Sequence, residues 1–173
     1  RIYTFLTTLF YILEDSGKYP NKSIWVLDRP NPAGRPVEGQ KLNMDFASFV
    51  GAAPLPMRHG FTLGEAARWY CSFQKLNVDL QIVPMKNYDP EQKPDFGWPQ
   101  QQLCWVNPSP NMPRLTTVRQ YAGTVLLEGT TLSEGRGTTR PLENFGAPGL
   151  DSWKVLTEME NFAPHWHKGC QLR

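Results

Sequence analysis

The chain has 173 residues, of which 40% are apolar, and its 18 basic and 16 acidic side chains give a formal net charge of +2. This length suits a domain of ordinary size with a buried core, and the apolar content excludes a disordered or low-complexity protein. The charges nearly balance and form no run of Lys or Arg, so we expect no nucleic-acid partner.

The spacing of the cysteines and the length of the apolar segments exclude a disulfide framework, a CxxC metal pair and a membrane span. Cys71, Cys104 and Cys170 are widely spaced and odd in number, which is neither a disulfide framework nor a CxxC metal pair. No stretch reaches about 18 uninterrupted apolar residues, so we expect no membrane span in this chain. The apolar opening segment lacks the pattern of a signal peptide, and the chain does not begin with Met. We therefore expect a part of a longer protein.

The first elements are predicted from apolar spacing. Apolar residues at helical intervals predict a helix over residues 2–13 that ends near Gly17. Residues 24–27 are short, apolar and rich in β-formers, which indicates a strand. A second extended piece is expected at residues 54–57.

The middle of the chain has the clearest local signal. Thr62 and Glu65 fit a capping box, in which each side chain bonds to the backbone amide of the other, so a helix is expected to begin there. Residues 80–83 predict the next strand, and residues 87–102 are polar, without period, and predict a long loop.

The last third alternates again between apolar and polar segments. A short helix is expected at residues 117–122, a strand at 124–127 and a glycine-rich polar loop at 133–140. Asp151 or Ser152 is expected to cap a final helix that runs through Met159.

Strands that alternate with helices predict an α/β fold with a mostly parallel sheet flanked by helices. In such sheets, ligands bind at the carboxyl ends of the strands. Polar clusters begin at Asp28, Arg58 and Glu128, each directly after an expected strand. The sequence therefore predicts one site where these loops meet.

The loop that follows Glu128 contains the densest cluster of candidates. It holds two carboxylates and two guanidinium groups on a backbone with three glycines; the candidates are Glu128, Ser133, Glu134, Arg136, Thr138 and Arg140. Carboxylates accept hydrogen bonds from sugar hydroxyls and Arg binds carboxylates with two parallel bonds, so the cluster suits a polyhydroxyl or carboxylate-bearing ligand. The alternative is that Glu and Arg pair with one another and only hold the shape of the loop.

Other candidates lie on the two earlier loops and on a proline-rich segment. Arg29 and Asn31 offer a cation and an amide on a rigid loop, although an Asx turn with a solvated Arg would explain them equally. Arg58 and His59 end the extended piece, and His59 is either a ligand-binding residue or a hydrogen-bonded structural one. Asn111 lies between prolines, where it is placed either to bind a ligand or to form a turn.

No metal or cofactor is expected. His165, His167 and Cys170 lack an evident fourth ligand, and their spacing matches none of the usual zinc sites. Trp98 and Trp105 flank the long loop, where each either stacks on a sugar ring or anchors the loop to the core.

Several segments in a fixed order resemble one known family. They are VLDRPNP at residues 26–32, PLPMRHGFTLGEAAR at 54–68, WVNPSPNMP at 105–113 and GTVLLEGTTLSEGRGTTRPLENFGAP at 123–148. Together they are similar to the NamZ-like exo-β-N-acetylmuramidases, which are glycoside hydrolases formerly classed as a domain of unknown function. The similarity covers the chain from its start to about residue 148, with a weaker tail after it.

The resemblance implies a fold and an activity. Family members remove N-acetylmuramic acid from the non-reducing ends of peptidoglycan fragments during cell-wall turnover and recycling, so muramic-acid-containing saccharides or muropeptides are the expected partners. They have a Rossmann-like part and a smaller C-terminal part, with the site in the cleft between them. This chain would then be a single incomplete domain, with the end of the Rossmann-like region at about residues 1–85 and the smaller part at about 86–173. Export is also implied, with a periplasmic, extracellular or lipid-anchored location.

The resemblance also suggests roles for the candidates. The family's upstream Pro-Glu-His-Gly motif, whose Glu is the favoured acid/base, is not in this chain. Glu134, with Glu128 as the other candidate, would serve as the second carboxylate or as a hydroxyl acceptor, and one of the arginines would bind the lactyl carboxylate of muramic acid. Because the upstream motif is missing, a non-catalytic sugar- or cell-wall-binding module stays open as the alternative. A phosphate-using transferase is disfavoured, since no P-loop accompanies the glycines.

Overall fold

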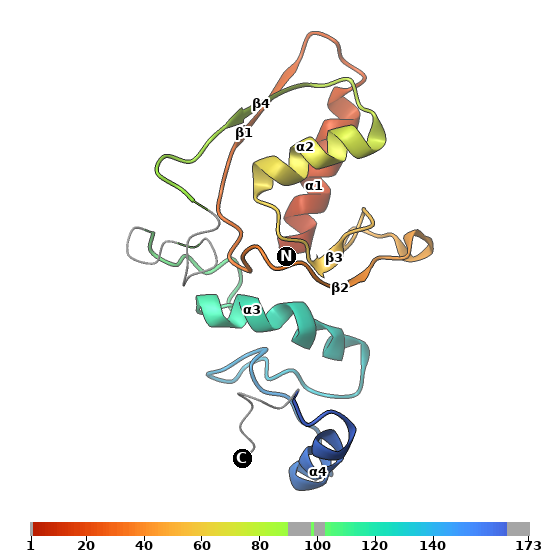
Figure 1. The fold of residues 1–173 in the computed structure, drawn as a ribbon, viewed down its shortest axis with the longest axis vertical. Coiled ribbons are helices and arrows are strands. Elements are labelled where there is room, and N and C mark those ends of the chain that lie inside the picture. The colour runs from red at the N-terminus through yellow and green to blue at the C-terminus, as the bar shows by residue number, and fades with distance from the viewer. Residues whose placement is uncertain (1, 90–97, 99–102, 166–173) are drawn as a thin grey trace.

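Helices α1 and α2 and a parallel strand pair form the upper part of the structure in Figure 1. The computed structural model describes residues 2–89, 98 and 103–165. Helix α1 (Ile2–Ser16) precedes strand β1 (Ser23–Leu27), and helix α2 (Leu63–Gln74) precedes strand β4 (Asp79–Val83). β1 and β4 pair in parallel, from Ser23 opposite Asp79 to Leu27 opposite Val83. The predicted α/β class, with a parallel sheet flanked by helices, is confirmed.

The main core lies between these helices and one face of the strand pair. Phe10 and Leu13 of α1 and Tyr70 of α2 are buried with Val26 of β1. The rings of Phe10 and Tyr70 stack with their centroids 3.9 Å apart. Trp25 of β1 is 65% exposed, because successive side chains of a strand point to opposite faces. The apolar spacing that predicted α1 and β1 thus corresponds to burial against this core.

A second, antiparallel pair was only half predicted. Strand β2 (Glu38–Lys41) pairs with β3 (Pro56–Arg58), with Glu38 opposite Arg58, and the 3-10 helix η1 (Met44–Phe46) lies between them. All four residues of β2 are exposed and polar or glycine, so no period-two apolar pattern marks the strand. β2 forms because its backbone pairs with β3, and no pattern in the residues of β2 indicates that pairing.

Helix α3 (Leu115–Thr124) crosses beneath β3 and begins the lower part of the molecule (Figure 1). Its Val118 and Tyr121 are buried in a second cluster with Met112 and Leu142, and Tyr3 of α1 packs against that cluster. The predicted helix in this region is confirmed, and it places Tyr121 against Tyr3, with ring centroids 5.8 Å apart.

Helix α4 (Ser152–Phe162) lies farthest from the parallel strands (Figure 1). The Asp151 carboxylate caps it by accepting from the backbone amides of Trp153 and Lys154. Asp151, not Ser152, is therefore the N-cap. None of the residues of α4 is buried.

The strand expected at residues 124–127 is wrong. These residues continue from α3 into the 3-10 helix η2 (Val125–Gly129). The Thr124 hydroxyl donates to the backbone carbonyls of Gln120 and Leu142, which holds the end of α3 in helical geometry. β-forming residues make a strand only where a partner strand is available, and none lies beside them in the described structure. Glu128 therefore sits on a helical turn and not at a strand end.

Some sequence predictions fall on residues that the structure does not describe. Most of the loop expected at residues 87–102 lies outside the described residues, as do His167 and Cys170 of the possible metal triplet. Within the described ranges, no group of three or more potential metal ligands is present. In the same ranges, no helix has the length and apolar character needed to cross a membrane.

Candidate functional site

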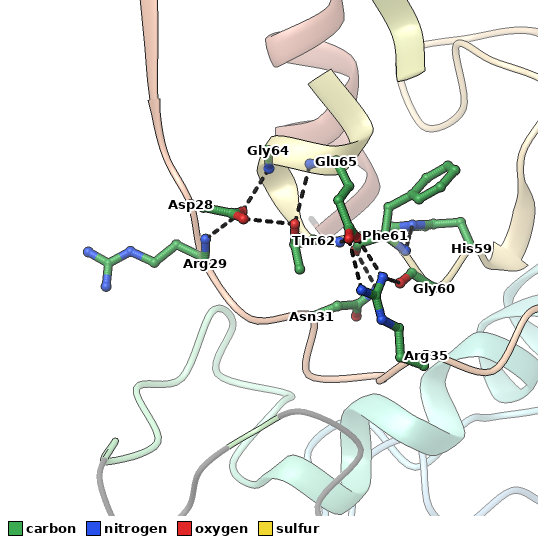
Figure 2. Close-up of polar contacts among 10 residues, drawn as sticks. All are labelled: Asp28, Arg29, Asn31, Arg35, His59, Gly60, Phe61, Thr62, Gly64 and Glu65. Atoms are coloured by element: carbon green, nitrogen blue, oxygen red, sulfur yellow. Dashed lines mark hydrogen bonds and ion pairs between the residues drawn. The ribbon is translucent and has the colours of Figure 1, made fainter. Parts of the chain in front are cut away.

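The loop that follows β1 is tied to the start of α2 by the Asp28 carboxylate (Figure 2). One carboxylate oxygen accepts from the amides of Arg29, at 2.8 Å, and Gly64, at 2.7 Å, and the other accepts from the Thr62 hydroxyl at 2.9 Å. Negative charge at a helix N-terminus is favourable, so Asp28 both closes the loop and caps the helix. The Arg29 side chain points away from this network in Figure 2.

The predicted capping box is present, and Arg35 extends it. The Thr62 hydroxyl accepts from the Glu65 amide at 3.3 Å, and the Glu65 carboxylate accepts from the Thr62 amide at 2.9 Å. Arg35 forms two hydrogen bonds with the same carboxylate, at 2.6 and 2.8 Å, and a third with the Gly60 carbonyl at 3.1 Å. The Arg35 hydrogen bonds lower the pKa of Glu65 against the opposing effect of burial. Arg35 therefore fixes the segment after β1 to the start of α2 through Glu65 and to the loop after β3 through Gly60.

Asn31 and His59 are held by hydrogen bonds to backbone groups. The side-chain oxygen of Asn31 accepts from the backbone amide of Ala33 at 2.9 Å, and its side-chain nitrogen donates to the backbone carbonyl of Phe61 at 3.0 Å. His59 Nδ1 accepts from the Phe61 amide at 3.2 Å, so the neutral ring has its proton on Nε2. Burial lowers the pKa of His59, which favours this neutral form. Asn31 therefore joins the two loops, and His59 keeps one ring donor for other partners.

Arg58 is largely buried beneath the same loops. It forms an ion pair with Glu38 of β2, and its Nη2 donates to the Ala33 carbonyl at 2.7 Å. Its side chain is only 16% exposed. The Nε atom is buried and has no hydrogen-bond partner in the described structure.

A small pocket opens between these loops and α3. Its polar lining comes from Asn31, Arg58 and His59, and its remaining lining from Tyr3, Ala33, Met57, Val118, Tyr121 and Ala122. The Tyr3 hydroxyl donates to the Met57 carbonyl, which joins α1 to β3 at the pocket wall. Burial raises the pKa of both tyrosines above the ordinary value, so both hydroxyls keep their protons near neutral pH.

The loop that begins at Ser133 is held by its own hydrogen bonds. Ser133 pairs with Gly146 in an isolated bridge, and its hydroxyl accepts from the Gly135 amide at 3.3 Å. Thr138 donates to the Gly135 carbonyl at 2.6 Å and accepts from the Arg140 amide at 3.2 Å. The hydroxyls of Ser133 and Thr138 therefore have structural partners within this chain.

Arg136 pairs with both candidate carboxylates of this loop. It contacts Glu128, which is 41% exposed in its side chain, and Glu134, whose side chain is 11% exposed. The hydrogen bond that Arg136 donates to the Glu128 carboxylate is the main cause of the raised pKa of Arg136. The Glu128 charge also adds to the burial that raises the pKa of Tyr121. Glu128 and Glu134 thus form one ion-paired cluster around Arg136, and Glu128 acts electrostatically on Tyr121 of the pocket lining.

The structure brings some predicted residues together and separates others. Asn31, Arg58 and His59 share one pocket, and Glu128, Glu134 and Arg136 form a separate ion-paired cluster. The pocket lining does not include Arg29, Asn111, Ser133, Thr138 or Arg140. Ligand binding by these eleven candidates stays a prediction.

Sequence reasoning missed the apolar wall of the pocket and the role of Arg35. Tyr121 and Val118 belonged to a predicted helix, but the helical pattern does not show that this helix packs against β3. Arg35 lies in a segment without a motif. Its bond to Glu65, 30 positions away, depends on the tertiary fold.

Comparison with known proteins decides the family. Residues 1–116 match the family model described as exo-beta-N-acetylmuramidase NamZ, N-terminal, and residues 119–173 match the corresponding C-terminal model. The chain belongs to the NamZ exo-β-N-acetylmuramidase family. The resemblance seen in the sequence is therefore confirmed, while the division predicted near residue 85 stays a prediction.

Two relatives within the NamZ family are similar over most of the chain. The peptidoglycan beta-N-acetylmuramidase NamZ of Bacillus subtilis (strain 168) is 43% identical over 161 residues, which is 92% of this chain and 37% of that protein. The crystal structure of a DUF1343 family protein from Bacteroides fragilis NCTC 9343 superposes with a TM-score of 0.74 at 35% identity, covering 87% of this chain and 41% of that one. The chain thus spans about two fifths of the length of each relative.

His59, which is partly buried and neutral, predicts a pH-dependent loss of stability. An unfolded His takes up a proton below pH about 6.5, whereas the folded state resists protonation, so folded-state stability decreases as pH falls through that value. His59→Asn keeps an acceptor for the Phe61 amide but does not titrate. Between pH 7 and pH 5, we expect the melting temperature of the full-length protein to fall less in this variant than in the wild type. Equal decreases would contradict the assignment of His59 as a neutral group in the folded protein.

Proposed function

We propose that the full-length protein is an exo-acting glycoside hydrolase that releases N-acetylmuramic acid from the non-reducing ends of peptidoglycan fragments. The observation that supports this most is the 43% identity to a protein named as a peptidoglycan beta-N-acetylmuramidase. Because this chain spans only 37% of that relative, it would supply part of the site and the remaining segments would supply the rest.

In this proposal the acidic cluster near Tyr121 takes part in the chemistry. Glycosidases commonly use two carboxylates, one as acid or base and one as nucleophile or base. Glu134, the more buried of the pair, would be the second carboxylate or a hydroxyl acceptor, and the acid/base would come from the upstream segment. Arg136 would orient Glu134 through their ion pair.

The four candidate arginines differ in how available they are to a ligand carboxylate. Arg58 and Arg136 are already paired with carboxylates of this chain. Arg29 and Arg140 are exposed and belong to none of the ion pairs seen among the described residues. The proposal therefore assigns the lactyl carboxylate of muramic acid to Arg29 or Arg140.

The proposal extends to a biological role. An enzyme that removes terminal N-acetylmuramic acid would act in the turnover and recycling of the bacterial cell wall. Peptidoglycan lies outside the cytoplasmic membrane, which supports an exported location that is periplasmic, extracellular or lipid-anchored.

One observation favours a second candidate function, a non-catalytic sugar- or cell-wall-binding module. Both Glu128 and Glu134 are engaged by Arg136, as expected if the loop is only a scaffold. The reading frame upstream of Arg1 separates the two functions. A Pro-Glu-His-Gly segment there would support the enzyme, and an unrelated domain would support the module.

The activity is tested with the full-length protein and two chromogenic substrates, an N-acetylmuramide and an N-acetylglucosaminide. We expect hydrolysis of the muramide and a much slower reaction with the glucosaminide, which lacks the lactyl carboxylate. Cleavage of the glucosaminide without cleavage of the muramide would exclude the proposed substrate.

A further inference from the structure

Glu143 anchors the segment of residues 142–146 on the start of α3. Its Oε1 atom accepts from the Thr117 hydroxyl at 2.6 Å and from Arg114 Nε at 2.9 Å, with a longer contact to the Thr116 hydroxyl at 3.4 Å. The Glu143 side chain is only 9% exposed, and Thr117 is fully buried. Negative charge is favourable at the N-terminus of a helix, and the first turn of α3, all of which the structure describes, contains no acidic residue of its own. Glu143 therefore takes the place of a local cap for α3.

Leu142, the residue before Glu143, is held at the other end of α3. Its side chain is buried in one cluster with Val118 and Tyr121, and its carbonyl accepts from the Thr124 hydroxyl at 2.8 Å. Its φ is +62°, in the left-handed region that residues with a side chain rarely adopt. Such a conformation persists only where the surrounding contacts enforce it, and such residues cluster at active sites. Leu142 and Glu143 together fasten this segment along the length of α3.

The anchored segment holds the backbone of Glu134. The Leu142 amide donates to the Glu134 carbonyl at 2.7 Å. Next to this bond, Ser133 and Gly146 exchange two backbone hydrogen bonds, at 2.8 and 3.0 Å. The position of Glu134 relative to α3 is therefore set by the way residues 142–146 are anchored on that helix.

We infer that Glu143 is a positioning residue for Glu134. The inference rests on the proposed function, in which the Glu134 carboxylate takes part in the chemistry. A displacement of about 1 Å can lower the rate of an enzyme about 100-fold. Through Val118 and Tyr121, α3 also lines the pocket between β3 and α3. Glu143 therefore fixes the loop of Glu134 to the same helix that forms one wall of that pocket.

A double-mutant cycle in the full-length protein separates positioning from stabilisation of the fold. Glu143→Ala, Glu134→Gln and their combination are assayed on the chromogenic muramide. With Glu134 present, we expect Glu143→Ala to lower kcat about 10-fold and to leave KM nearly unchanged. In the Glu134→Gln background the charge to be positioned is gone, so the same change should alter kcat less than about 2-fold. A residue that only stabilised the fold would give the same loss in both backgrounds.

Thr117 provides a second pair of variants, which decides the matter even if Glu143→Ala does not fold. Thr117→Val removes the hydroxyl that holds the Glu143 carboxylate, whereas Thr117→Ser keeps it. We expect Thr117→Val to lower kcat several-fold and Thr117→Ser to stay near the wild-type value. Thr157→Val is the control, because the Thr157 hydroxyl donates to the Trp153 carbonyl at an exposed position of α4, and its kcat should equal that of the wild type.

The outcomes distinguish this inference from the proposed function. Equal losses of kcat for Glu143→Ala in the two backgrounds, near-normal activity of Glu134→Gln, or equal kcat for Thr117→Val and Thr117→Ser would overturn the inference and leave the proposed substrate standing. If the protein cleaves the glucosaminide and not the muramide, the proposed function fails, and the same cycle on the glucosaminide decides the inference. Cleavage of neither sugar would overturn both.

Discussion

Replacing Glu134 by Gln in the full-length protein is expected to lower kcat/KM by about 100-fold or more while the melting temperature stays nearly unchanged. Gln keeps the shape of the side chain but removes the charge that a second catalytic carboxylate needs. Folding should survive, because Arg136 keeps its ion pair with Glu128 and the Glu134 backbone carbonyl still accepts from the Leu142 amide at 2.7 Å.

Glu158→Gln is the matched control for this variant, since Glu158 is an exposed carboxylate on α4, and it should leave both kcat/KM and stability unchanged. If Glu134 is catalytic, the Gln variant lowers kcat/KM and leaves the melting temperature nearly unchanged. If Glu134 only holds the loop in shape, kcat/KM stays near normal. Near-normal activity of Glu134→Gln, or a lowered melting temperature as its only effect, would show that Glu134 is a scaffold residue.

A second large effect is expected on stability, from Gly60→Ala. Gly60 has φ of +72°, and a Cβ there would lie 2.5 Å from the Arg35 carbonyl oxygen. The left-handed conformation costs a residue with a side chain about 1–2 kcal/mol, and the clash with backbone adds about 1–3 kcal/mol more. Because Gly60 also accepts from Arg35, relief of the clash would disturb the Arg35–Glu65 ion pair.

We therefore expect Gly60→Ala to lower the free energy of unfolding by about 3 kcal/mol, seen as a clearly reduced melting temperature. Gly123→Ala is the control, because a Cβ at Gly123 meets nothing within 4 Å and Ala is the better helix former inside α3. That variant should be neutral or slightly more stable. Similar melting temperatures for both variants would show that the loop after β3 adapts to a side chain at position 60.

The helices and strands that are marked by a pattern of neighbouring residues were predicted from the sequence. The capping box of Thr62 and Glu65 gave the start of α2, and apolar runs gave β1 and β4, because these signals are read over a few neighbouring residues. The expected strand at residues 124–127 failed because its β-formers found no partner strand. β2 was missed because its residues are polar and pair with β3 through the backbone alone.

The candidate site was predicted only in part, for the same reason. Polar residues after β1 and β3 were expected to meet, and Asn31, Arg58 and His59 do line one pocket. The other wall of that pocket comes from α3, some 60 positions later in the chain, and no local pattern specifies that contact. The alternative role of the Glu and Arg residues, pairing with one another, was visible in the sequence, but only the fold shows that Arg136 contacts both carboxylates.

The central claim is that the loops after β1 and β3 and the loop from Ser133 surround one bound muramic acid. A crystal structure of the full-length protein soaked with N-acetylmuramic acid tests this most directly. We expect the sugar to contact Arg58 or His59 of the pocket lining and to place a hydroxyl within hydrogen-bond distance of Glu134. A sugar bound elsewhere, out of contact with both the pocket and Glu134, would contradict the account.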